Sequence, residues 1–96
     1  MNRPQSKITL KLGTAVKIQT LLSQINPDIV TIEIEDPSEK VKIDYVAMSK
    51  VADNVYQYIY QSSTSDDDGE YKITIKAVYG SYTSIEQNWF ILEDID

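Results

Sequence analysis

A strict two-residue alternation in residues 71–79 limits the fold of this chain more than any other feature. The residues on one phase of the alternation are apolar or aromatic: Tyr71, Ile73, Ile75, Ala77 and Tyr79. Successive side chains of a strand point to opposite faces, so this pattern predicts a β-strand with one buried face. Further strands are then needed to cover that face.

Six other segments have the features of short strands and are separated by turn residues. These segments are residues 7–12, 15–25, 29–35, 40–45, 55–61 and 82–92. Gly, Pro, Asn and Asp residues lie between them, and residues 46–54 are less regular and are expected to cross between two sheets. Seven short strands with frequent turns predict an all-β fold, an immunoglobulin-like β-sandwich of about seven antiparallel strands.

Two of these segments carry specific expectations about which side chains are buried. In residues 7–12, Ile8, Leu10 and Leu12 share the phase expected to face inward. In residues 82–92, Trp89 lies on the phase opposite to Phe90. A one-residue bulge at residues 86–88 would bring both aromatic side chains into the core.

Residues 15–25 fit two kinds of secondary structure. Ala15, Ile18, Leu22 and Ile25 have helical spacing, whereas the set Val16, Ile18, Thr20 and Leu22 has strand spacing. The β-branched residues and the short break after the preceding strand favour a strand. A helix here would instead give a small α+β fold, as in a regulatory domain.

Composition narrows the classes of function. The 96 residues suit one domain: residues 1–6 as a flexible segment, 7–93 as the sandwich and 94–96 as an acidic tail. The chain has no histidine and no cysteine, which are the commonest general base and the thiolate nucleophile. No paired nucleophile and base and no glycine-rich phosphate loop is present either, so we expect no enzyme.

Charge and hydropathy restrict the partners. A net charge of −6 argues against nucleic acid, and no apolar run is long enough to cross a membrane. The N-terminus has no apolar signal-peptide region, so synthesis in the cytoplasm is expected. Residues 1–27 carry four basic residues and no acid, whereas residues 28–96 carry all 15 acids. This asymmetry is either incidental or favours head-to-tail contacts between copies in a homo-oligomer.

The spacing Asp67-x-Gly69-x-Tyr71-x-Ile73 resembles the segment before the sixth strand of immunoglobulin-like domains. In that family the tyrosine hydroxyl bonds to the backbone a few residues upstream and fixes the corner between sheets. The resemblance implies structural roles for Asp67, Gly69, Tyr71 and Ile73, and Ile73 stands where antibody domains have a cysteine.

A closer resemblance is to the cysteine-free immunoglobulin-like domains of bacteria and their phages, over residues 7–92. Four motifs carry it in order: Asp36-Pro37, Val55-Tyr56-Gln57-Tyr58-Ile59-Tyr60, residues 69–77 and Tyr82-Thr83-Ser84. It implies a non-catalytic structural or interaction module, encoded by a phage or provirus and associated with a virion. Its partner would be a protein, either a second copy or a larger assembly.

The densest cluster of carboxylates is Asp66, Asp67, Asp68 and Glu70. Ca²⁺ prefers six to eight oxygen ligands, so this loop is a candidate calcium site, although it lacks the spacing of an EF-hand. Alternatively, the acids are solvated and shape the loop by accepting backbone hydrogen bonds. Apart from this possible calcium ion, no cofactor is expected.

Two surfaces are candidates for binding a partner. If residues 7–12, 15–25 and 55–61 form one sheet, its outer face holds Leu21, Val55 and Ile59 and few acids. Tyr79 and Tyr82 flank the last turn and could form a binding tip, including a platform for carbohydrate. A carbohydrate- or calcium-binding module is therefore the alternative to a protein-interaction module.

Overall fold

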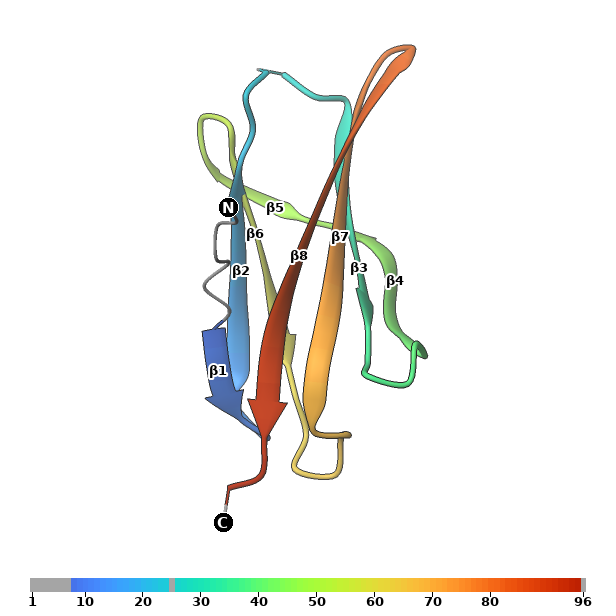
Figure 1. Cartoon of the computed structure of the whole chain (residues 1–96). Helices are drawn as coiled ribbons and strands as arrows, with labels where there is room; N and C mark the ends of the chain where they lie inside the picture. Colours follow the sequence, from blue (N-terminus) through green and yellow to red (C-terminus); the bar gives the residue numbers. More distant parts are fainter. Residues whose placement is uncertain (1–7, 25, 96) are drawn as a thin grey trace, which may run out of the picture.

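The computed structural model describes residues 8–24 and 26–95, and in this part of the chain it contains strands and no helix (Figure 1). The strands are β1 (Ile8–Lys11), β2 (Ala15–Leu21), β3 (Ile29–Glu35), β4 (Val41–Ala47), β5 (Ser49–Ala52), β6 (Val55–Gln61), β7 (Gly69–Tyr79) and β8 (Tyr82–Glu93). The predicted all-β class is confirmed, and the alternative with a helix at residues 15–25 is wrong.

The strands form two packed sheets. One sheet has the order β1-β8-β7-β3-β4 and the other has the order β2-β6-β5. The chain changes sheet between β4 and β5, through the buried Met48, as expected for residues 46–54. The predicted immunoglobulin-like sandwich is confirmed, but it has eight strands in the described residues, and β1 runs parallel to β8.

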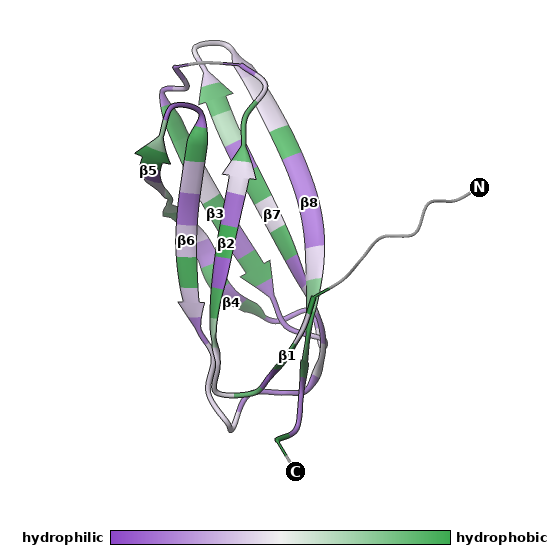
Figure 2. Ribbon diagram, turned by 90° about the vertical axis from the view of Figure 1, so that its left-hand side faces the viewer, coloured by the Kyte–Doolittle hydropathy of each residue, from purple (hydrophilic) through white to green (hydrophobic). Residues whose placement is uncertain are grey.

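The segment with ambiguous spacing forms strand β2. Its residues alternate between exposed and buried, and Val16, Ile18 and Thr20 point inward. An uninterrupted antiparallel register with β6 holds it in place, from Ala15 opposite Gln61 to Leu21 opposite Val55. In Figure 2 the alternation appears as hydrophobic and hydrophilic bands along both strands. Ile25, which belonged to the helical pattern, lies outside the described residues.

Aromatic packing fills one end of the core between the sheets. The Tyr71 and Phe90 rings stack with their centroids 5.2 Å apart, and the Tyr60 ring lies 6.3 Å from each. Tyr71, Ile32, Ile34 and Leu92 are the largest fully buried side chains. Large aromatic side chains bury much apolar surface, which is the dominant favourable term in folding.

Tyr71 also fixes the loop that leads into β7. Its hydroxyl donates a hydrogen bond of 2.6 Å to the backbone carbonyl of Asp67, and burial raises the pKa of Tyr71 to about 12. Gly69 follows with a φ of +129°, and a Cβ at this position would lie 2.9 Å from Cγ of Pro37. Only glycine tolerates both the backbone conformation and the close approach of Pro37.

Two expectations about buried side chains are wrong. Ile8 is 60% exposed, because β1 lies at the edge of its sheet, beside only the lower end of β8 (Figure 1). The bulge at residues 86–88 is absent, since β8 pairs with β7 in continuous register from Tyr82 to Leu92. Alternation alone therefore turns Phe90 inward and leaves Trp89 on the outer face, where it is 37% exposed.

Replacing Tyr71 by Phe tests the contribution of the corner hydrogen bond. We expect Tyr71→Phe to lower the free energy of unfolding by about 1–2 kcal/mol, because the carbonyl of Asp67 loses a partly buried donor. Tyr79→Phe is the matched control, since the Tyr79 hydroxyl bonds to the exposed carbonyl of Gln24, which water can satisfy instead. Urea denaturation of both variants measures the difference, and equal losses would contradict this role of Tyr71.

Candidate interaction surface

The outer face of the three-stranded sheet, here called the β2–β6 face, gathers exposed apolar side chains. Its residues are Ala15, Lys17, Gln19 and Leu21 of β2 with Val55, Gln57, Ile59 and Gln61 of β6. Leu21 is 74% exposed and lies opposite the half-buried Val55, whereas Ile59, 53% exposed, lies opposite Lys17. A hydrogen bond of 2.9 Å from the Gln19 amide to Gln57 lies between the Leu21–Val55 pair and the Lys17–Ile59 pair.

The charge of the β2–β6 face differs from that of the chain as a whole. The three strands of this sheet contain none of the chain's 15 acidic residues, and Lys17 is the charged residue on the face itself. The face is therefore apolar and weakly basic on an acidic protein. Such a surface suits a partner that is apolar or carries carboxylates.

The structure changes the predicted composition of this face. Residues 7–12 were expected to extend it, but β1 belongs to the other sheet, where Thr9 lies opposite Ile91. Lys11 instead forms an ion pair of 2.9 Å with Glu93. Of the interaction residues predicted from the sequence, Leu21, Val55 and Ile59 remain together on one face.

The predicted pair of exposed tyrosines at the β7–β8 turn is not formed. Tyr82 is 77% exposed, but Tyr79 packs against the core, and its hydroxyl bonds to the carbonyl of Gln24 at 2.9 Å. The turn itself is held by Asp28, whose carboxylate accepts a hydrogen bond of 2.7 Å from the backbone N–H of Gly80. A two-tyrosine platform for a sugar ring is thus absent from this tip.

The sandwich is open on the side where β2 and β8 face each other. A cavity of about 230 Å³ lies there, lined by Val16, Ile18, Ile73, Ile75, Phe90 and five further residues. The Thr20 hydroxyl crosses the gap and donates a hydrogen bond of 2.6 Å to Glu86. Along this side, the side chains of residues 82–89 of β8 are exposed on both faces of the strand.

Sequence reasoning missed this exposed half of β8, although one signal was present. Ser84, Glu86 and Asn88 share the phase of the buried Phe90 and Leu92, yet they are polar. Polar residues at the inward positions of a strand indicate that the opposite sheet does not cover this part of the strand. Ile85, 63% exposed, lies on the outer phase of the same half.

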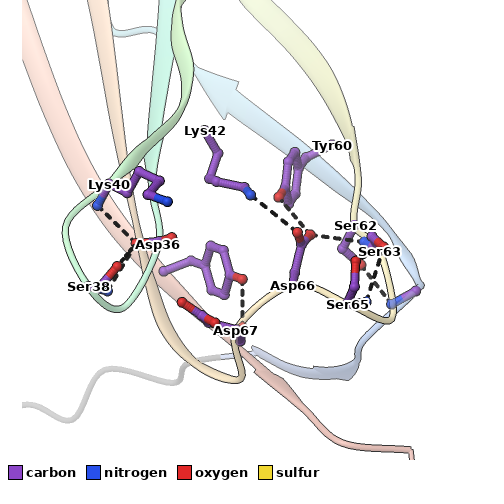
Figure 3. Close-up of polar contacts among 12 residues, drawn as sticks. Asp36, Ser38, Lys40, Lys42, Tyr60, Ser62, Ser63, Ser65, Asp66 and Asp67 are labelled. Atoms are coloured by element: carbon purple, nitrogen blue, oxygen red, sulfur yellow. Dashed lines mark hydrogen bonds and ion pairs between the residues drawn. The ribbon is translucent and has the colours of Figure 1, made fainter.

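Asp66 organises the acidic loop through hydrogen bonds and an ion pair (Figure 3). Its carboxylate accepts bonds from the backbone N–H of Ser63 at 2.9 Å and from the Tyr60 hydroxyl at 3.1 Å. The Lys42 ammonium lies 3.2 Å from the other carboxylate oxygen. Burial acts to raise the pKa of Asp66, but these three donors outweigh it and lower the pKa.

The four carboxylates predicted as a calcium site do not converge. No group of three or more potential metal ligands is present in the described part of the chain. Asp66 faces Lys42, and the backbone carbonyl of Asp67 accepts the Tyr71 hydroxyl bond. The arrangement therefore supports the alternative, in which acids of this loop shape it by accepting hydrogen bonds.

A second carboxylate plays the same part in the neighbouring β3–β4 turn. Asp36 accepts hydrogen bonds from the backbone N–H groups of Lys40 and Ser38, both at 2.9 Å, and from the Ser38 hydroxyl (Figure 3). The bond from Lys40 is the strongest influence, and together these bonds lower the pKa of Asp36. The ends of the strands beside the aromatic core are thus fixed by two ionised aspartates.

Stability should fall in acid as these carboxylates are protonated. The pKa of each carboxyl is lower in the folded protein than in the unfolded chain, so its ionised form stabilises the fold. This contribution to stability is present above the pKa of the unfolded chain, about 3.9, and is lost as the pH falls through the pKa of the folded protein. We expect Asp66→Asn to cost about 1 kcal/mol at pH 7 and less at pH 2.5. Urea denaturation at both values measures this, with Asp68→Asn as the control. A cost that stays constant between the two values would contradict the role of Asp66.

Comparisons with known proteins support the fold. No protein-family model matches the chain, and no curated protein matches it. Among solved structures it is similar to CopC from Methylosinus trichosporium OB3b, with a TM-score of 0.69 over 97% of this chain and 89% of that chain. At 10% sequence identity this likeness shows a shared β-sandwich fold alone. The described residues contain no helix long and apolar enough to span a membrane.

Proposed function

We propose that this protein is a non-catalytic, immunoglobulin-like interaction module that docks its β2–β6 face on a protein of a larger assembly. The observation that carries the proposal is the exposure of Leu21 and Ile59 on a sheet without a single carboxylate. Exposed apolar side chains on a face depleted of acids are typical of a surface that becomes buried on binding.

The charge distribution indicates what the partner's surface contains. Lys17 lies opposite Ile59, so an ammonium group stands beside an exposed apolar side chain. A complementary surface places an apolar patch over Leu21 and Ile59 and a carboxylate near Lys17. Charge complementarity of this kind sets the orientation of a complex more than its affinity.

The larger assembly that we favour is a virion. The support comes from the sequence resemblance to cysteine-free immunoglobulin-like domains of phages, together with the sandwich fold that the structure provides. In this proposal a phage or provirus encodes the chain, the host cytoplasm makes it, and it is incorporated into the particle. The Asp66 carboxylate serves the fold, and the outer faces of the sheets are the surfaces that we assign to binding.

Charge substitutions on the β2–β6 face test the proposal. We expect Leu21→Glu and Ile59→Lys to weaken incorporation into purified particles at least tenfold, or by about 1.4 kcal/mol. The reason is that each variant buries a charge in an apolar contact. The abundance of each variant in particles is measured by mass spectrometry against the wild type. Ile95→Glu is the matched control, because Ile95 is equally exposed but lies beyond β8.

The outcomes separate the two parts of the proposal. Normal incorporation of both face variants would contradict docking through the β2–β6 face. Absence of the wild-type protein from purified particles would contradict the virion role, whatever the variants do. Circular dichroism of each variant shows that it retains the strand spectrum of the wild type.

A further inference from the structure

The free edge of β8 is a surface that the proposed docking face does not use. β1 pairs with β8 only from Phe90 to Glu93, and no strand in the described residues pairs with this edge between Tyr82 and Trp89. The hairpin of β7 and β8 extends past the neighbouring loops at the top of Figure 1. A strand edge of this length offers backbone donors and acceptors to another strand.

The direction of the backbone groups along this edge follows from the β1 pairing. The N–H of Leu12 donates to the carbonyl of Glu93 at 2.9 Å, so odd-numbered residues of β8 turn their backbone groups toward the edge. Alternate residues of a strand turn these groups to opposite sides. Thr83, Ile85 and Gln87 therefore present their N–H and C=O groups outward, whereas the even-numbered residues pair with β7.

Features that usually protect an edge strand from pairing are absent from residues 82–89. They contain no proline, no lysine and no glycine, and Glu86 is their only charged residue. The register with β7 has no bulge. The other edges differ, since β4 and β5 contain register shifts, β1 has four residues and β2 carries the exposed Lys17.

We infer that β8 pairs with β8 of a second copy in an antiparallel arrangement centred on Ile85, which joins two five-stranded sheets into one. A two-fold axis through Ile85 places Thr83 opposite Gln87 of the second copy. These are the outward-facing residues, so each such pair exchanges two backbone hydrogen bonds. The occupant of the edge is thus a second copy of this chain.

Side-chain chemistry disfavours registers shifted toward the C-terminal end of β8. Centring on Ile85 places Glu86 opposite Ser84 of the second copy, and Tyr82 opposite Asn88, which lines the cavity. Centring on Glu86 instead opposes two like charges, which destabilises a strand pair. Centring on Gln87 brings Ser84 against Phe90, whose edge β1 already occupies.

The register also gives the exposed Tyr82 and Ile85 a role. Ile85 of each copy meets its equivalent on the outer face of the joined sheet. Tyr82, on the inner phase, lies beside Asn88 of the second copy at the mouth of the cavity between β2 and β8. Both side chains would be solvated in a monomer and partly covered in the dimer.

Single cysteines test the register, since the full-length chain has no cysteine of its own. In the proposed pair the two Cα atoms of residue 85 lie about 5.5 Å apart. The Cβ atoms of such a hydrogen-bonded pair, about 5.5 Å apart, are too distant for an unstrained direct disulfide but are within reach of a short bifunctional thiol reagent. With that reagent we expect Ile85→Cys to form a cross-linked dimer. Gln87→Cys, whose side chain lies on the same exposed face, should remain uncross-linked.

Sedimentation velocity over a wide range of concentration tests the association itself. We expect the wild type to show a monomer–dimer equilibrium and Ile85→Lys to raise the dissociation constant at least tenfold. That variant opposes two ammonium groups at the axis and leaves the β7 pairing intact. Ile29→Lys, an exposed isoleucine on the same sheet outside the contact, should dimerise as the wild type does.

Three results would overturn the inference: a monomeric wild type at every concentration, cross-linking through residue 87 and not residue 85, or unchanged dimerisation of Ile85→Lys. A monomeric full-length chain would assign the edge to another occupant, such as the segment before Ile8 or a different protein. Because Leu21 and Ile59 lie on the other sheet, loss of dimerisation leaves docking through the β2–β6 face unaffected, and the two proposals fail separately.

Discussion

The pairing of β7 between β3 and β8 is the interaction on which the rest of the structure depends. β7 holds continuous antiparallel registers with both neighbours, and its inward face carries Tyr71, Ile73, Ile75 and Ala77, all buried. Because both edges of β7 are paired and one face is covered, its position fixes the five-stranded sheet. The Tyr71 ring then contacts Tyr60 of the opposite sheet and stacks on Phe90 of the neighbouring strand β8.

The unequal lengths of neighbouring strands determine which surfaces remain free. β8 has 12 residues, whereas β1 has four, so most of the outer edge of β8 has no neighbour in the described residues. On the opposite sheet, β2 and β6 match in length and their inward residues alternate regularly, which leaves Leu21 and Ile59 outside. The candidate partner surfaces therefore follow from strand length and register rather than from any cluster of reactive groups.

Most of the fold could be predicted from the sequence because alternation and turn residues are local signals. Residues 71–79 and 55–61 form the predicted strands, and the change of sheet falls at residues 46–54. The errors at Ile8 and Trp89 have a different origin. Alternation in the sequence predicts that neighbouring side chains lie on opposite faces of a strand. Whether a face is covered depends on how the strands and sheets are arranged around it. The β1–β8 pairing, which joins the two ends of the chain, left no local signal in either segment.

The candidate surfaces were predictable to different extents for the same reason. Leu21, Val55 and Ile59 are on outward phases of two strands that pair, so their clustering followed from alternation. The role of Asp66 depended on Lys42 and Tyr60, which come from other strands, and could not be inferred from the acidic run alone. The free edge of β8 required knowledge of where β1 ends.

Amide hydrogen exchange, resolved by residue, tests most directly whether the edge of β8 is a contact surface. The N–H groups of Ser84 and Glu86 face β7 and should be protected in both dilute and concentrated solutions of the full-length protein. The N–H groups of Thr83, Ile85 and Gln87 should exchange rapidly when dilute and become protected when concentrated. Rapid exchange of these three groups at every concentration would contradict the account.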